Sequence, residues 1–141
     1  GALARSRGIS LMVEPLVMST NPEGGISSVG DPEKIATLVR QAVELGADII
    51  KVDPCEPMER FAEIVDIAHP IPVLVRGGGK VTTRELLERT KIAIDVGASG
   101  VVYGRNVVQH PDPGSLIAAL RAIVHNNSSV EDALALVKEL V

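Results

Sequence analysis

Short apolar runs that alternate with helical patterns constrain the fold of this chain more than any other sequence feature. Such runs occur at residues 9–13, 48–53, 72–76 and 100–104. They are largely continuous instead of alternating apolar with polar residues, which is typical of parallel strands buried on both faces of a sheet. Because a helical pattern follows each run, the sequence predicts an α/β fold built from βαβ units.

Helix start and stop signals frame the predicted helices. Asp31 is an N-cap residue followed by proline at the first helical position, and Gly46 is placed to end that helix. Thr82 and Glu85 fit a capping box for a later helix. These signals and the apolar spacing predict a long loop at 14–30 and helices at 31–46, 57–69, 82–97, about 113–124 and 129–140.

Two architectures use such units, an open doubly wound sheet and a (βα)8 barrel. A complete barrel needs about 250 residues, and the 141 residues of this chain supply only four units. The choice therefore depends on the carboxyl ends of the strands, where parallel sheets carry their functional groups. Those ends carry Glu14, Lys51 with Asp53, Arg76 with Gly77–Gly79 and Lys80, and Gly104 with Arg105 and Asn106.

Lys51 is a basic residue inside an otherwise apolar strand. Burial among apolar neighbours disfavours the charged form of an amine, and a free amine can attack a carbonyl to form a Schiff base. Alternatively, the side chain reaches solvent or pairs with Asp53, which lies on the same side of the strand if the side chains alternate. The strand alone leaves both interpretations open.

Two successive strand ends carry groups that suit a phosphate. Gly77, Gly78 and Gly79 leave backbone amides uncovered just before a helix. Gly104 permits close approach of a ligand, and Arg105 supplies a guanidinium fork. Taken alone, a glycine triplet is more often an ordinary turn, and such an arginine is more often a surface residue paired with a helix carboxylate. Their coincidence favours the barrel, because the last two strands of a (βα)8 barrel are the usual place for a phosphate site.

The segments GADIIKVD, PVLVRGGGK and GASGVVYGRNVVQHPDP resemble the last three strand units of the class I (Schiff-base) aldolases of archaeal and bacterial type. That group includes fructose-bisphosphate aldolases, the autoinducer-2 thiolase and deoxyribose-phosphate-aldolase-like relatives. The resemblance implies that Lys51 forms the Schiff base. It also implies that the substrate phosphate is bound by Gly77, Gly78, Gly104 and Arg105.

This chain departs from the family pattern at two of its strand ends. Glu14 stands where many members have a tyrosine as general acid, which makes Glu14 the candidate acid/base. The alternative for Glu14 is an exposed loop carboxylate. Arg76 stands where the family has a serine, and it could add a second cation for a phosphate or acidic group. The first-strand acid that the family uses for proton transfer has no counterpart here.

Composition narrows the class of function. The net charge is −4 with no block of lysines or arginines, which argues against a nucleic-acid or anionic-membrane partner. Cys55 is the single cysteine, so no internal disulfide is expected, and the cytoplasm is the expected compartment. The histidines lack the spacing of metal ligands, and we expect neither a metal nor a cofactor.

The sequence as a whole predicts that residues 1–141 are the C-terminal part of a single aldolase-type TIM-barrel domain, contributing about four βα units. The expected function is a class I aldolase-type lyase that acts on a phosphorylated, fructose-bisphosphate-like sugar. The alternatives are a Schiff-base thiolase or transaldolase on the same scaffold, and a phosphate-binding half-barrel without catalysis. Either a homo-oligomer or association with an N-terminal half is expected, because strands 9–13 and 100–104 would otherwise be bare edges.

Overall fold

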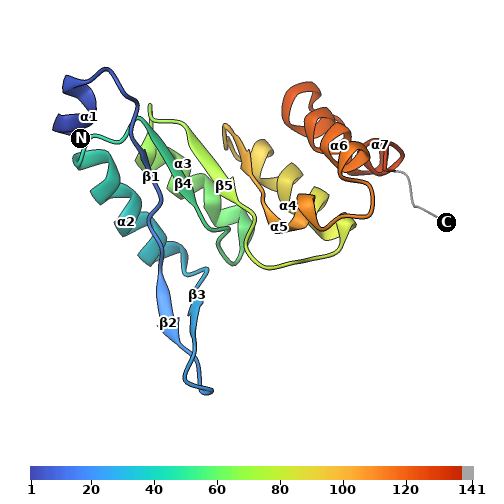
Figure 1. The fold of residues 1–141 in the computed structure, drawn as a ribbon, viewed down its shortest axis with the longest axis horizontal. Coiled ribbons are helices and arrows are strands. Elements are labelled where there is room, and N and C mark those ends of the chain that lie inside the picture. The colour runs from blue at the N-terminus through green and yellow to red at the C-terminus, as the bar shows by residue number, and fades with distance from the viewer. Residues whose placement is uncertain (138–141) are drawn as a thin grey trace.

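A parallel sheet organises the part of the chain that this computed structural model describes, residues 1–137 (Figure 1). Its strands lie in the order β1 (Met12–Val13), β4 (Ile49–Val52), β5 (Val73–Arg76) and β6 (Gly100–Val102). Every pairing in this sheet is parallel, which confirms the predicted α/β class. All these strands therefore end at the same edge of the sheet, where their last residues and following loops meet.

Helices connect the strands in the predicted alternation. The connections are α2 (Pro32–Glu44) between β1 and β4, the 3-10 turn η1 (Met58–Arg60) with α3 (Phe61–Ala68) between β4 and β5, and α4 (Thr83–Asp95) between β5 and β6. Before the sheet lies α1 (Ala2–Ser6), and after it come α5 (Arg105–Val108), α6 (Pro113–Asn126) and α7 (Val130–Leu134). Among residues 1–137, no helix combines the length and apolar character needed to cross a membrane.

The helix caps follow the sequence signals. The Asp31 side chain accepts hydrogen bonds from the backbone amides of Glu33 and Lys34 at the start of α2. At the start of α4, Thr82 and Glu85 form both hydrogen bonds of the capping box. These bonds satisfy amides that a helix leaves without an internal partner, so local sequence alone specifies where both helices begin.

Several predicted boundaries are wrong in detail. Only residues 12–13 of the predicted strand 9–13 pair in the sheet, and the Leu11 amide donates to the Asp48 carboxylate at 2.7 Å. The predicted loop 14–30 contains a hairpin formed by β2 (Met18–Thr20) and β3 (Ile26–Ser28). The short helix α5 was not predicted. The predicted helix 129–140 is observed only as the shorter α7, which ends at Leu134, and residues 138–140 lie outside the described chain.

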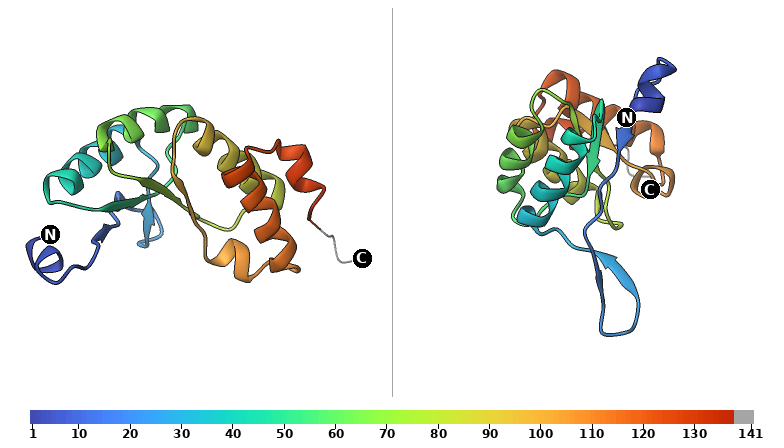
Figure 2. Two further views of the ribbon diagram at one scale, coloured as in Figure 1. Left: turned by 90° about the horizontal axis from the view of Figure 1, so that it is seen from above. Right: turned by 90° about the vertical axis from the view of Figure 1, so that its left-hand side faces the viewer.

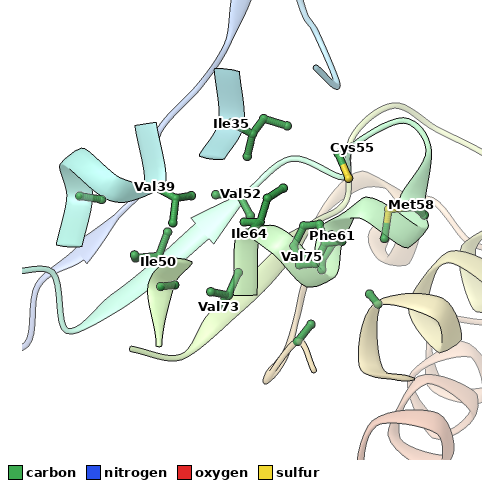
Figure 3. Packing of buried hydrophobic residues seen from close by; sticks show 14 of the residues in the cluster. Ile35, Val39, Ile50, Val52, Cys55, Met58, Phe61, Ile64, Val73 and Val75 are labelled. Atoms are coloured by element: carbon green, nitrogen blue, oxygen red, sulfur yellow. The ribbon is translucent and has the colours of Figure 1, made fainter. Parts of the chain in front are cut away.

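The main core lies between the sheet and the helices that cover it. Figure 3 shows Ile50 and Val52 of β4 with Val73 and Val75 of β5 packed beside Ile64 of α3. A second cluster joins α4, α6 and α7 through their apolar residues, which are Leu86, Leu87, Leu116, Ala119, Leu120, Ile123 and Ala133. The first cluster packs the strands against their helices, whereas the second packs helices against one another.

The other face of the sheet is open. In the left-hand view of Figure 2, α2, α3 and α4 (cyan, green and yellow) lie along one side of a curved sheet. Burial alternates accordingly: Ile50 and Val52 are buried, whereas Ile49 and Lys51 are only partly so. On β1, Met12 is 46% exposed. The expectation of strands buried on both faces is therefore wrong for residues 1–137, since helices cover one face only.

Candidate active site

Most of the predicted site residues line one cavity at the carboxyl edge of the sheet. Its volume is about 300 Å³. The lining consists of Lys51, Arg76, Gly77, Gly78, Val102, Tyr103, Gly104, Arg105 and Asn106. Parallel register brings them together, because Lys51 pairs with Leu74 and Arg76 pairs with Val102 on successive strands. A larger cavity of about 520 Å³ lies elsewhere, beside the start of α4 and α7.

The Lys51 amine meets the Glu14 carboxylate. Its Nζ donates to Oε2 of Glu14 over 2.9 Å, and the two side chains are 19% and 36% exposed. Glu14 follows the last residue of β1, while Lys51 lies in the neighbouring strand β4. The predicted nucleophile and the predicted acid/base are thus within direct proton-transfer distance. Glu14 lies in the loop after β1 and is exposed, as the alternative interpretation expects, but its carboxylate contacts both Lys51 and Arg76.

Arg76 lies between two carboxylates. Its Nε is 3.1 Å from Oε1 of Glu14, and its Nη1 is 3.0 Å from both carboxylate oxygens of Asp53. Asp53 therefore pairs with Arg76, whereas the sequence had left open a pair with Lys51. The four side chains form a continuous series of alternating charge, from Asp53 through Arg76 and Glu14 to Lys51.

Sterics fix the loop after β5. A Cβ on Gly77 would lie 3.1 Å from Cδ1 of Tyr103, which is closer than nearly all real contacts of that kind. Gly78 has φ of +58°, a backbone conformation that side chains disfavour. Among residues 1–137 the amides of Gly78 and Gly79 donate no hydrogen bond. These amides are therefore free for a ligand.

Asn106 holds this loop in place, a role that sequence reasoning did not assign to it. Its Nδ2 donates to the carbonyls of Gly77 and Gly79, both at 3.1 Å, and its Oδ1 accepts from the Val81 amide at 3.1 Å. The residue is only 7% exposed. Its neighbours Gly104 and Arg105 drew attention to the stretch, but the role of Asn106 requires knowing that the loops after β5 and β6 meet.

Gly104 and Arg105 border the other side of the cavity. A Cβ on Gly104 would meet no other atom within 4 Å, so the space beside it is open. The Arg105 side chain is exposed, and within residues 1–137 it forms no ion pair. The alternative of a surface arginine paired with a helix carboxylate thus finds no support in the described part of the chain.

Burial affects two further titratable groups of the described chain, Tyr103 and Cys55. Burial raises the pKa of Tyr103, whose hydroxyl lies 2.9 Å from Oγ1 of Thr90. Burial also raises the pKa of the Cys55 thiol to about 11. No group of three or more histidine, cysteine, aspartate or glutamate side chains suited to a metal ion occurs in residues 1–137.

Comparison with known proteins decides the family. Residues 1–110 match the sequence profile described as DeoC/LacD family aldolase. The chain belongs to the DeoC/LacD aldolase family. Within sequences of known function, it is 43% identical over 121 residues to a class 1 fructose-bisphosphate aldolase of Halobacterium salinarum. That match covers 85% of this chain and 46% of the relative, so the chain spans about half the length of the curated relatives it matches.

Solved structures of aldolases have the same fold as this chain. The crystal structure of an archaeal fructose 1,6-bisphosphate aldolase superposes with a TM-score of 0.74 at 32% identity, over 89% of this chain and 48% of that one. Another archaeal fructose-1,6-bisphosphate aldolase has its catalytic lysine covalently bound to the carbinolamine intermediate of the substrate. It superposes with a TM-score of 0.73 at 29% identity, over 87% and 48% of the two chains. Such neighbours are TIM-barrel aldolases, and the resemblance inferred from sequence is confirmed.

Proposed function

We propose that the protein carrying these residues is a class I aldolase-type lyase that cleaves or forms a C–C bond of a phosphorylated sugar. The observation that carries this proposal is the cavity in which the Lys51 amine and the loops after β5 and β6 meet. A fructose-bisphosphate-like substrate is supported by the relatives, which are fructose-bisphosphate aldolases. A lysine and a phosphate site in one cavity suit a ketose phosphate.

The Lys51–Glu14 pair can carry the first proton transfer. Glu14 takes a proton from the Lys51 ammonium across the 2.9 Å contact, which leaves a neutral amine and a carboxylic acid. The amine attacks the substrate carbonyl carbon and forms a carbinolamine. Glu14 then returns its proton to the carbinolamine hydroxyl, water leaves, and an iminium ion forms.

The iminium ion drives the cleavage. It withdraws the electron pair of the adjacent C–C bond while a base removes the proton of the substrate hydroxyl, so that an aldehyde leaves and an enamine remains. Protonation of the enamine carbon and hydrolysis of the imine release the ketone and restore Lys51. Free amides of Gly78 and Gly79, with Gly77, Gly104 and Arg105 around them, would hold the phosphate throughout. Arg76 also lines the cavity, and its role as a further phosphate ligand stays a prediction.

Borohydride trapping tests the function. Incubation of the full-length protein with dihydroxyacetone phosphate and borohydride should leave a reduced adduct on Lys51, identified by mass spectrometry of peptides. The Lys51→Arg variant should form none, because a guanidinium stays charged and cannot act as the nucleophile. The matched control Lys80→Arg should label as the wild type does. An adduct on Lys80, or an active enzyme without any adduct, would contradict the assignment.

Assays on the full-length protein also distinguish the lyase from the alternative functions. A thiolase or transaldolase would give the Lys51 adduct but a different product when a thiol or a second aldehyde is supplied. A phosphate-binding protein without catalysis would bind dihydroxyacetone phosphate and give no adduct. Aldol cleavage of fructose 1,6-bisphosphate together with the Lys51 adduct supports the lyase.

We further propose that residues 1–141 are the C-terminal half of one barrel domain, which the rest of the same polypeptide closes. The open face of the sheet supports this, as does a groove of about 270 Å³ beside β6. Leu74, Gly100, Ile117 and Leu120 contribute to that groove. The relatives are about twice as long as this chain, so further strands and helices of the same polypeptide could cover the open face and the groove.

Expression of the 141-residue chain alone tests this architecture. We expect an oligomeric, partly molten or aggregated product that barely cleaves fructose 1,6-bisphosphate, because both sheet edges are unpaired. Sedimentation and the cleavage assay measure the two properties. A well-folded, active monomer would contradict the proposal, and an active dimer would show that a second copy closes the sheet. Homo-oligomerisation and cytoplasmic location of the full-length protein stay predictions, to be measured by sedimentation and by cell fractionation.

A further inference from the structure

Arg76 is the link between the buried interior and the pair of groups proposed to move protons. It contacts Glu14 through Nε and Asp53 through Nη1, at 3.1 and 3.0 Å. Glu14 uses its other oxygen for Lys51. A guanidinium donates in a fixed plane, so two carboxylates held by one arginine are fixed relative to each other. The orientation of Glu14 toward Lys51 thereby depends on Arg76.

Burial identifies the anchored end of this series. The Asp53 side chain is 7% exposed, whereas those of Arg76 and Glu14 are 31% and 36% exposed. Asp53 is not among the residues that line the cavity, although Lys51 and Arg76 are. Arg76 is the cavity-lining side chain that Asp53 contacts, so we expect Asp53 to act on a bound ligand through Arg76.

Charge balance explains why the arginine is needed. Lys51 and Arg76 carry two positive charges, and Glu14 and Asp53 carry two negative charges, so the cluster is neutral. Removal of the guanidinium leaves two carboxylates to share one ammonium. A buried carboxylate without a partner is costly, and it would compete with Glu14 for the Lys51 amine.

We propose that Arg76, anchored by Asp53, is a positioning residue that holds the Glu14 carboxylate against the Lys51 amine. This inference rests on the proposed Schiff-base function. It assigns Arg76 to proton transfer through Glu14, a role distinct from that of a phosphate ligand. The two roles make opposite predictions for a substrate that lacks the phosphate.

Borohydride trapping with a matched pair of ketones distinguishes these roles in the full-length protein. Dihydroxyacetone phosphate and dihydroxyacetone differ only in the phosphate. In Arg76→Gln the second-order rate constant of adduct formation, measured well below saturating ketone, should fall by about 10- to 100-fold for both, the scale of a misplaced catalytic group. The ratio of the two rates should stay as in the wild type, and this ratio does not depend on the fraction of folded protein.

Asp53→Asn supplies the second variant. It should lower both rates in the same way, and the double variant should be no slower than Arg76→Gln alone, because Asp53 acts only through Arg76. Arg60→Gln is the matched control. Its guanidinium holds the Glu63 carboxylate at 2.9 and 2.8 Å on the protein surface, so the trapping rates should not change.

Three outcomes would overturn the inference. A loss confined to dihydroxyacetone phosphate would make Arg76 a phosphate ligand. Unchanged rates in Arg76→Gln would make it a bystander, and losses that multiply in the double variant would show that Asp53 does not act through Arg76. Failure of the proposed function is recognised separately, because the wild type would then form no adduct on Lys51 with either ketone.

Discussion

The two faces of the sheet use alternate residues of the same strands for different purposes. Ile50, Val52, Val73 and Val75 point toward the helices and are at most 1% exposed. Lys51 and Arg76, their neighbours in sequence, point the other way and line the candidate site with 19% and 31% of their side chains exposed. Alternation along a strand thus separates stability from chemistry at single-residue resolution. Substitutions on one face should leave the property carried by the other face largely intact.

The largest expected effect lies on the helix-covered face. Ile64 of α3 is fully buried, and Ile64→Ala should lower the free energy of unfolding by about 3 kcal/mol through lost burial and a residual cavity. Leu74→Ala, on the open face, should cost only about 1 kcal/mol if that face stays open, because Leu74 is only partly buried there. Urea denaturation of the full-length protein measures both values.

The Leu74 variant also sharpens the comparison. In the full-length protein the same Leu74→Ala change should cost about 2–5 kcal/mol if further strands cover the open face. An equally small cost in the full-length protein would mean that this face stays open.

The next effect concerns ligand binding at the open face. Arg105→Ala should weaken dihydroxyacetone phosphate binding by about 1.5–3 kcal/mol, the scale of a charge-assisted hydrogen bond. Titration calorimetry measures the change. Dihydroxyacetone, without the phosphate, should bind equally well to both proteins, and the denaturation midpoint should not move because Arg105 is exposed. Equal losses for both ketones would mean that Arg105 supports the fold.

A smaller effect is expected where the helix layer meets the site loop. Thr82→Ala removes the cap of α4 and should cost about 1 kcal/mol of stability with little change in phosphate binding.

Hydrogen bonds from Thr82 lower the pKa of Glu85 in the folded protein. This stabilisation is present above the pKa of Glu85 in the unfolded chain and is lost as pH falls through the folded value. The stability difference between variant and wild type should therefore shrink in acid, as denaturation at pH 7 and pH 3 can measure. A weaker phosphate affinity in Thr82→Ala would show that the cap also shapes the site.

The smallest effect concerns Cys55, which belongs to the main core. Because burial raises the pKa of the thiol from 9.0 to about 11, it stays protonated at neutral pH and should resist iodoacetamide until the protein unfolds. The raised folded pKa adds stability that is complete below pH 9.0 and is lost as pH rises through about 11. A Cys55→Ser variant should lack this alkaline loss. Rapid labelling of the folded wild type at pH 7 would contradict the burial of the thiol.

Sequence reasoning succeeded where the physics is local. The caps at Asp31 and Thr82 depend on residues within one turn, and the βαβ alternation depends on patterns within about ten residues. The hairpin of β2 and β3 was missed, because strands of three residues are too short to show a period of two. The start of β1 was predicted too early, and the contact between the Leu11 amide and the distant Asp48 carboxylate is one that no local pattern reveals.

Pairings within the site could be predicted only in part. Parallel strands bring their ends together, so the cluster of Lys51 with the two glycine loops was predictable from topology. The pairing of each carboxylate with a particular cation could not be predicted from topology. Lys51 pairs with Glu14 and not with Asp53, because the register of β1 beside β4 places Glu14 next to the amine. The role of Asn106 could not be predicted for the same reason, since its hydrogen-bond partners lie 25–29 residues away.

The contact between Glu14 and Arg76 has a consequence for the history of this family. These two positions depart from the pattern of the class I aldolases that the sequence resembles, and their side chains lie 3.1 Å apart. We expect these two positions to vary together in the family, because replacing either residue removes the ion pair that joins them. Lineages with glutamate at position 14 should therefore carry arginine at position 76 far more often than chance allows. Sorting family members by this pair should separate subgroups more cleanly than overall identity does.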